Sequence, residues 1–73
     1  MNYKMAFPKR LTEVRKEAGK TQDEMAIAMD IARPSYTMYE TGASFPKFEN
    51  LMKIADILNV SIDYLVGLSN KKN

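Results

Sequence analysis

The sequence predicts an all-α protein in which five short helices enclose one hydrophobic core. Apolar residues recur at intervals of three and four along most of the 73 residues, which is the spacing of amphipathic helices. Gly19, Gly42 and Gly67 each follow such a stretch, and glycine commonly ends a helix. No segment sustains the alternation of apolar and polar residues that is typical of a strand. A chain of this length forms a single domain.

Composition narrows the possible functions. Apolar residues make up 45% of the chain and charged residues 27%, as in soluble globular proteins. The absence of Cys and His removes disulfides, thiolate metal sites and the commonest general base. No apolar run approaches the roughly 20 residues that span a bilayer. We therefore expect a cytoplasmic protein that is not an enzyme, with no cofactor, no metal, no membrane contact and no small-molecule substrate.

Charge is unevenly distributed along the chain. The net charge is +2, but residues 1–20 carry six Lys or Arg against two Glu. This basic segment precedes the two helices described below and can meet phosphates. It is too modest to indicate nucleic acid alone, because a run of charge is usually just a solvated face.

The first predicted helix spans residues 7–18. Pro8 suits its first turn, because the amide proton that proline lacks has no partner there. Residues 1–6 are therefore expected to form a flexible N-terminal arm. The apolar stripe of this helix, at intervals of four, three and four, consists of Phe7, Leu11, Val14 and Ala18.

Two short helices joined by a tight turn are predicted between Thr21 and Gly42. Thr21 and Glu24 have the spacing of a capping box, so the first of these helices should begin at Gln22. Asp30 lies where the chain must turn, and Asp tolerates a left-handed backbone. The apolar face of this helix is formed by Met25, Ala26 and Met29.

The second helix of the pair places Tyr36 and Tyr39 on one face and ends at Gly42. Two such helices with a turn of about four residues form a helix-turn-helix, whose second helix can enter a DNA major groove. The same pattern also fits an αα-hairpin inside a small bundle, so the spacing alone leaves both interpretations open. The positions left for solvent or a partner are Arg33, Ser35, Thr37 and Met38.

Two further helices follow. The strongest apolar stripe predicts a helix over Pro46–Leu58 that ends at Asn59. Ser61 then caps a last short helix that stops at Gly67, and residues 68–73 are expected to form a frayed tail. The residues predicted to face the core are Phe48, Leu51, Met52, Ala55 and Leu58, flanked by Ile54 and Ile57, and then Ile62, Leu65 and Val66.

Together these residues resemble a known family, the phage-repressor and Cro-type (XRE-like) helix-turn-helix domains, from about Phe7 to Gly67. Each motif is weak alone, but their order and spacing together are specific. The motifs are Leu11-x-x-x-Arg15 with Gly19, Thr21-Gln22-x-Glu24-Met25-Ala26, Ile31, Tyr39-Glu40-x-Gly42, Pro46, Leu51-x-x-Ile54-Ala55-x-x-Leu58 and Val60-Ser61-x-Asp63-x-Leu65-x-Gly67.

The resemblance implies a compact five-helix lambda-repressor-like domain over residues 7–67. It implies a bacterial or phage-encoded, nucleoid-associated regulator that binds an operator in double-stranded DNA as a homodimer, with the third helix in the major groove. Because the sequence stops soon after the last predicted helix, we expect no added sensor domain. The implied base-reading residues are Arg33, Pro34, Ser35, Thr37 and Met38. The implied phosphate contacts are Lys20, Thr21, Gln22, Thr41, Ser44 and Lys47, and the implied structural pair is Arg15 with Glu40.

Three residues depart from the family pattern. Ala32 stands where Ser or Thr usually caps the third helix, so that cap is lost. Pro34 disfavours a helical backbone at Arg33, which predicts that the helix starts one residue late, with Arg33 as its N-cap. Tyr36 replaces a small branched aliphatic side chain, so its ring must find extra room and its hydroxyl a partner.

The chemistry of the implied base-reading face leaves alternatives open. Arg33 can donate to guanine O6 and N7 together, or it can contact a phosphate instead. Pro34 and Met38 offer only apolar contacts, which predicts modest discrimination per half-site and reliance on dimer spacing and DNA shape. The alternative function is a protein-interaction module or an antitoxin in which DNA binding is weak or secondary. Candidates for a dimer surface are Ile57, Val60, Tyr64, Val66 and Leu68.

Overall fold

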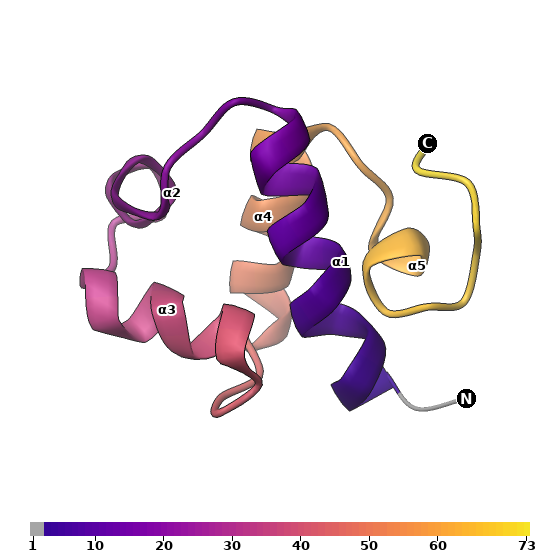
Figure 1. Cartoon of the computed structure of the whole chain (residues 1–73), viewed down its shortest axis with the longest axis horizontal. Coiled ribbons are helices and arrows are strands. Elements are labelled where there is room, and N and C mark those ends of the chain that lie inside the picture. Colours follow the sequence, from indigo (N-terminus) through magenta and orange to yellow (C-terminus); the bar gives the residue numbers. More distant parts are fainter. Residues whose placement is uncertain (1–2) are drawn as a thin grey trace.

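The computed structural model describes residues 3–73, with side chains from residue 5 onward, and every regular element in this range is a helix (Figure 1). The helices are α1 (Tyr3–Glu17), α2 (Gln22–Met29), α3 (Arg33–Thr41), α4 (Phe48–Leu58) and α5 (Ile62–Leu65). The prediction of an all-α, five-helix chain with a central two-helix unit is confirmed. None of these described helices is long and apolar enough to cross a membrane.

One hydrophobic core joins the five helices. α1 and α4 lie in the middle of the molecule, with α2 and α3 to one side and α5 to the other (Figure 1). α3 contacts both α1 and α2, so its inner face is held against two helices while its outer face lies at the surface. The buried apolar residues of this core are Phe7, Leu11, Val14, Met25, Ala26, Met29, Tyr36, Tyr39, Leu51, Ile54, Leu58, Tyr64 and Leu65.

Local sequence signals set most helix ends where they were expected. In the capping box of α2, the Glu24 N–H donates to Thr21 Oγ1 at 3.0 Å and the Thr21 N–H donates to Glu24 Oε1 at 2.8 Å. α2 and α4 end at Asp30 (φ 57°) and Asn59 (φ 54°), two residue types that tolerate the left-handed region. Gly42 ends α3 at φ 85°, where a side chain would be strained.

The start of α1 differs from the prediction. The helix begins at Tyr3 rather than near Pro8, which is its sixth residue. Proline removes one backbone hydrogen bond and disfavours a helical Phe7, but Phe7 is fully buried and this packing holds the turn. The predicted arm of residues 1–6 therefore overlaps α1 from residue 3, and residues 1–2 lie outside the described part of the chain. At its other end, Ala18 follows the helix and is exposed.

The buried face of α4 is narrower than predicted. The helix begins at Phe48 with Lys47 as its N-cap, and Pro46 is buried in the preceding loop instead of starting the helix. Phe48 is 68% exposed and Met52 is 49% exposed, so the prediction that they face the core is wrong. The reason is geometric, since the buried positions Leu51, Ile54 and Leu58 lie on one side and Met52 is turned about 100° from Leu51.

The C-terminal tail folds back on the domain, contrary to the expectation that it frays. The Arg10 guanidinium donates to the Ser69 carbonyl at 2.6 Å and to Asn70 Oδ1 at 3.0 Å. Lys72 Nζ forms an ion pair with Glu17 Oε1 at 2.6 Å. These contacts hold residues 69–72 beside α1.

The candidate dimer surface also needs a correction. Tyr64 is buried, with its ring beneath the Arg10 guanidinium at 4.3 Å and its hydroxyl donating to Glu13 Oε1 at 3.0 Å. Leu68 is 66% exposed. The other three candidates, which are partly buried, are Ile57, Val60 and Val66.

Candidate nucleic-acid interface

α2, α3 and the turn between them form a helix-turn-helix. Asp30 ends α2, and the N–H of Ile31 then donates to the Ala26 carbonyl at 3.0 Å, which tightens the turn. Tyr36 and Tyr39 are buried and hold α3 against the core. On its outer side α3 carries the five base-reading candidates, of which Arg33, Pro34 and Met38 are exposed and Ser35 and Thr37 are partly buried.

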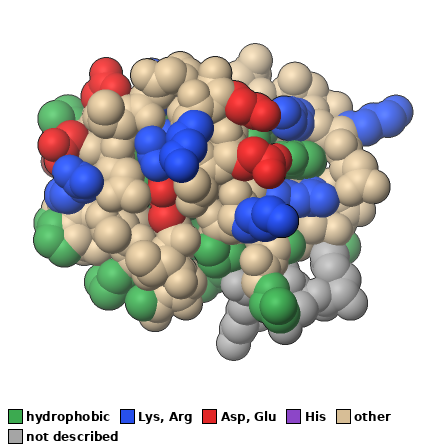
Figure 2. Space-filling model, viewed as in Figure 1, with side chains coloured by type: hydrophobic (Ala, Val, Ile, Leu, Met, Phe, Trp, Pro, Cys, Tyr) green, Lys and Arg blue, Asp and Glu red, His purple; other side chains and the backbone are tan. Residues whose placement is uncertain are grey.

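Charged side chains of both signs lie on the side of the molecule drawn in Figure 2. Figure 2 shows Lys and Arg side chains scattered among acidic ones, without one continuous basic patch in this view.

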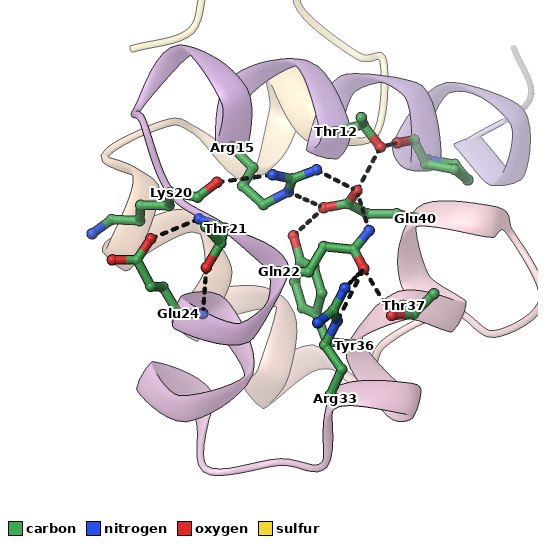
Figure 3. A network of polar contacts seen from close by, with 11 residues as sticks. Thr12, Arg15, Lys20, Thr21, Gln22, Glu24, Arg33, Tyr36, Thr37 and Glu40 are labelled. Carbon is green, nitrogen blue, oxygen red and sulfur yellow. Dashed lines mark hydrogen bonds and ion pairs between the residues drawn. The ribbon is translucent and has the colours of Figure 1, made fainter.

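The Glu40 carboxylate is the centre of a polar network between α1, α2 and α3 (Figure 3). Arg15 approaches it as a fork, with Nε 2.6 Å from Oε2 and Nη2 3.0 Å from Oε1. Thr12 Oγ1 donates to Oε1 at 3.1 Å and Gln22 Nε2 donates to the same oxygen at 3.0 Å. The Tyr36 hydroxyl donates to Oε2 at 2.5 Å. The pair of Arg15 and Glu40 is therefore present and ties the first helix to the end of the third.

Burial and hydrogen bonding act in opposite directions on this carboxylate. The Glu40 side chain is only 5% exposed. Burial raises the pKa of Glu40, but hydrogen bonds from Arg15, Tyr36 and Gln22 outweigh it, so the pKa lies below its ordinary value. The hydrogen bond to Glu40 raises the pKa of Arg15 despite its burial. Both groups are thus held in their charged forms.

Tyr36 meets both requirements set by its sequence position. Its side chain is fully buried, and its ring packs edge-on against Tyr39 with centroids 6.2 Å apart. Its hydroxyl has Glu40 as acceptor. Burial, together with this hydrogen bond, raises the pKa of Tyr36, so the hydroxyl stays protonated and donates.

Gln22 links this buried network to the surface of α3. Because its Nε2 donates to Glu40, its Oε1 faces α3 and accepts from Thr37 Oγ1 at 2.9 Å. The same Oε1 accepts from Nε and Nη2 of Arg33, each at 3.2 Å (Figure 3). The Gln22 amide is therefore engaged within the protein, on both its nitrogen and its oxygen.

Arg33 does not occupy the position expected for it. α3 begins at Arg33, and its N-cap is Ala32, which makes no side-chain cap. The prediction that Arg33 is the N-cap is thus wrong by one residue, because Arg33 adopts a helical backbone although the following Pro34 disfavours it. The Arg33 side chain is 51% exposed and its Nη1 forms an ion pair with Asp23 Oδ1 at 2.9 Å.

The phosphate candidates fall into two groups at opposite ends of the helix-turn-helix. Lys20, Thr21 and Gln22 precede or begin α2, whereas Thr41, Ser44 and Lys47 lie between the end of α3 and the start of α4. The Thr21 hydroxyl is engaged in the capping box, and the Lys20 carbonyl accepts from Arg15 Nη1 at 2.8 Å. The Thr41 hydroxyl is also engaged, since it donates to the Met38 carbonyl at 3.2 Å, whereas Lys47 is exposed.

Two residues of the network are missed by sequence reasoning, Thr12 and Asp23. Thr12 lies on α1, and its spacing from Glu40 carries no local signal. Asp23 carries one weak signal, the opposite charge of Arg33 at the first turn of the next helix. The first turns of α2 and α3, which carry Asp23 and Arg33, are brought together only by the turn between the two helices.

The comparisons with known proteins agree with this geometry. A family model described as helix-turn-helix matches residues 11–65. The chain is 48% identical over 63 residues to the cryptic phage CTXphi transcriptional repressor RstR of Vibrio cholerae, covering 86% of this chain and 56% of RstR. It is 45% identical over 67 residues to the uncharacterized HTH-type transcriptional regulator YqaE of Bacillus subtilis, covering 90% of this chain and 58% of YqaE.

A third relative is the HTH-type transcriptional regulator ImmR of Bacillus subtilis, 39% identical over 71 residues, which are 94% of this chain and 56% of ImmR. The chain thus spans little more than half the length of these curated relatives. No solved structure gives a significant match. The family model and the relatives confirm the resemblance read from the sequence, and the chain belongs to the phage-repressor and Cro-type (XRE-like) helix-turn-helix family.

Proposed function

We propose that this chain is a sequence-specific, double-stranded DNA-binding transcriptional regulator that binds its operator as a homodimer, with α3 in the major groove. The relatives' names, which describe transcriptional repressors and regulators, support this function. The observation that carries it is the presentation of α3, whose inner face is anchored by buried tyrosines while Arg33 and its neighbours face outward. Such a regulator acts in the cytoplasm, on the nucleoid.

Base reading in this proposal depends mainly on Arg33. A guanidinium can donate to guanine O6 and N7 together, which is the commonest specific contact in the major groove. Ser35 can donate to bases or phosphates, whereas Pro34 and Met38 can only make apolar contacts, for example with a thymine methyl. Thr37 already donates its one hydroxyl proton to Gln22 Oε1, so it can accept from a base or contact it with its methyl group. Direct discrimination per half-site is then modest, and dimer spacing and DNA shape supply the rest.

Phosphate contacts are proposed on both sides of the groove. Because the Gln22 amide is engaged with Glu40, Thr37 and Arg33, its contact with a phosphate is expected through the backbone N–H groups at the start of α2. Lys20 and Thr21 lie beside it. The second group, Thr41, Ser44 and Lys47, reaches the backbone from the other end of α3.

A homodimer is proposed because each chain carries one helix-turn-helix. Two-fold pairing would place two copies of α3 about 34 Å apart on one face of the DNA. Leu68 is the most exposed of the candidate interface residues. Tyr64 is buried and is not part of the proposed interface.

The first experiment is a selection from random duplexes, followed by titration of the winning and a scrambled duplex at low and physiological ionic strength. A palindromic winner bound about 10³-fold more tightly than scrambled DNA is the expected result. Arg33→Lys is the matched variant, since it keeps the charge but loses the bidentate fork. It should weaken binding to the winner by about tenfold and leave scrambled binding nearly unchanged.

Binding that is weak, abolished by salt and blind to sequence would refute the proposal. The protein-interaction alternative would then be preferred.

A further inference from the structure

Arg33 is restrained on two sides by groups from the first turn of α2. Gln22 Oε1 accepts from Nε and Nη2 along one edge of the guanidinium, and Asp23 Oδ1 accepts from Nη1 at 2.9 Å. A guanidinium carries five N–H groups. Among the described residues, these contacts engage one on each nitrogen, which leaves one N–H on Nη1 and one on Nη2. Guanine O6 and N7 together accept two N–H groups, so the number left matches a guanine edge.

Asp23 is an unexpected residue at a surface that faces DNA. Its side chain is 66% exposed and its charge opposes an approaching phosphate. It also offsets the charge of Arg33, so the pair attracts phosphates less than a lone Arg33 would. A restrained, partly neutralised guanidinium is poorly suited to general phosphate contact and better suited to a fixed acceptor pattern.

The restraint is continuous with the buried network. The orientation of Gln22 is set by Glu40, which requires its N–H groups on that side, and this turns Oε1 toward Arg33. Asp23 completes the restraint from the exposed side. Its loss leaves the buried hydrogen bonds of Glu40 in place, so its role can be tested without unfolding the domain.

We propose that Asp23 is a positioning residue that holds Arg33 for base contact rather than phosphate contact, and thereby sets the selectivity of the chain for its operator. This inference rests on the proposed function. Asp23 itself touches no base in this scheme, and it acts through the orientation of Arg33.

The test compares Asp23→Asn with Asp63→Asn. Both residues are aspartates at the second position of a helix, and α5, which carries Asp63, lies on the opposite side of the molecule from α2 (Figure 1). The two variants therefore make the same change in charge, each in the first turn of a helix. The measured quantity is the ratio of the dissociation constants for scrambled and selected duplexes.

We expect Asp23→Asn to lower this ratio about fivefold or more, chiefly by tightening binding to scrambled DNA. Asp63→Asn should leave the ratio within about twofold of the unmodified chain, because the loss of one negative charge affects binding to both duplexes alike. Asp23→Glu should restore most of the ratio, since it returns the carboxylate. Equal ratios for Asp23→Asn and Asp63→Asn would overturn the inference while leaving the proposed function intact.

A second measurement needs no DNA. The resonance of the Arg33 Nη1 hydrogen that donates to Asp23 Oδ1 should be sharp and slow to exchange with solvent in the unmodified chain and in Asp63→Asn, and broadened in Asp23→Asn. An unchanged resonance in Asp23→Asn would show that Asp23 does not hold Arg33, and would overturn the inference. A chain that fails to distinguish selected from scrambled DNA before any substitution would refute the proposed function, and the inference with it.

Discussion

Tyr36→Phe removes one donor from a buried carboxylate without changing the shape of the core. The Tyr36 side chain is fully buried, and phenylalanine fills nearly the same volume, so no cavity the size of a side chain is created. What is lost is the hydroxyl that donates to Glu40 Oε2 at 2.5 Å. Arg15 Nε still donates to that oxygen, so the carboxylate keeps its charge partner.

The expected loss follows from the charge and burial of the acceptor. Hydrogen bonds to charged groups contribute roughly 1.5–3 kcal/mol to stability, about twice the contribution of neutral ones. Glu40 is 5% exposed, so water has little access to replace the hydroxyl. We expect Tyr36→Phe to lower the free energy of unfolding by about 2 kcal/mol, which is about 8–16 °C in Tm for a chain of this size.

Urea denaturation followed by circular dichroism at neutral pH measures this change, with the slope m checked for constancy. Tyr39→Phe is the matched control, because the Tyr39 hydroxyl accepts from the neutral Asn50 Nδ2 at 3.2 Å. It should cost no more than about 1 kcal/mol. Equal losses for the two variants would refute the reasoning, as would an effect of Tyr36→Phe that persists undiminished when Glu40 is already Gln.

Three further predictions concern pH and the ends of α3. The folded-state pKa of Glu40 is lowered, so its contribution to stability is present above the ordinary pKa of a glutamate and is lost as pH falls through the lower, folded value. Acid titration should show a larger loss in the unmodified chain than in Glu40→Gln, where the lowered pKa of Glu24 still contributes. Ala32→Ser should raise the free energy of unfolding by about 1 kcal/mol in urea, because Ala32 already has the extended backbone of an N-cap (φ −69°, ψ 145°) and lacks only the hydroxyl; no gain would show that the first turn of α3 cannot accept a cap. Gly42→Ala should cost about 1–2 kcal/mol, since φ is 85° and the new Cβ would lie 3.4 Å from Pro8 Cγ; a Tm equal to that of the unmodified chain would contradict this.

The helix ends were predictable where one or two residues decide them. Thr21 with Glu24, Asp30 and Gly42 act through their own backbone and that of near neighbours, so sequence suffices. The start of α1 depends instead on whether the burial of Phe7 compensates for Pro8, which only the folded packing decides. The exposure of Phe48 has the same origin, because a stripe of apolar residues does not say which of them a neighbouring helix will cover.

The sequence proposes residues for the candidate site but does not predict how they are connected. Arg33, Thr37 and Gln22 are identified from the family resemblance, and the structure places them in contact. The sequence does not predict that these three side chains are linked to Glu40, or that Asp23 forms an ion pair with Arg33. These side chains lie on different helices, and hydrogen-bond partners far apart in sequence leave no periodic pattern.

The C-terminal clasp, formed by the hydrogen bonds of Arg10 with Ser69 and Asn70, has a consequence for the order of folding. It joins residues that are 59 and 60 positions apart, whereas the pair of Arg15 and Glu40 is separated by 25. Closing the longer loop costs more chain entropy, so the first three helices should assemble before the tail docks. Interactions that form after the rate-limiting step slow unfolding without speeding folding. Arg10→Ala should therefore raise the unfolding rate in stopped-flow experiments and leave the folding rate unchanged, and a slower folding rate would place the clasp in the nucleus.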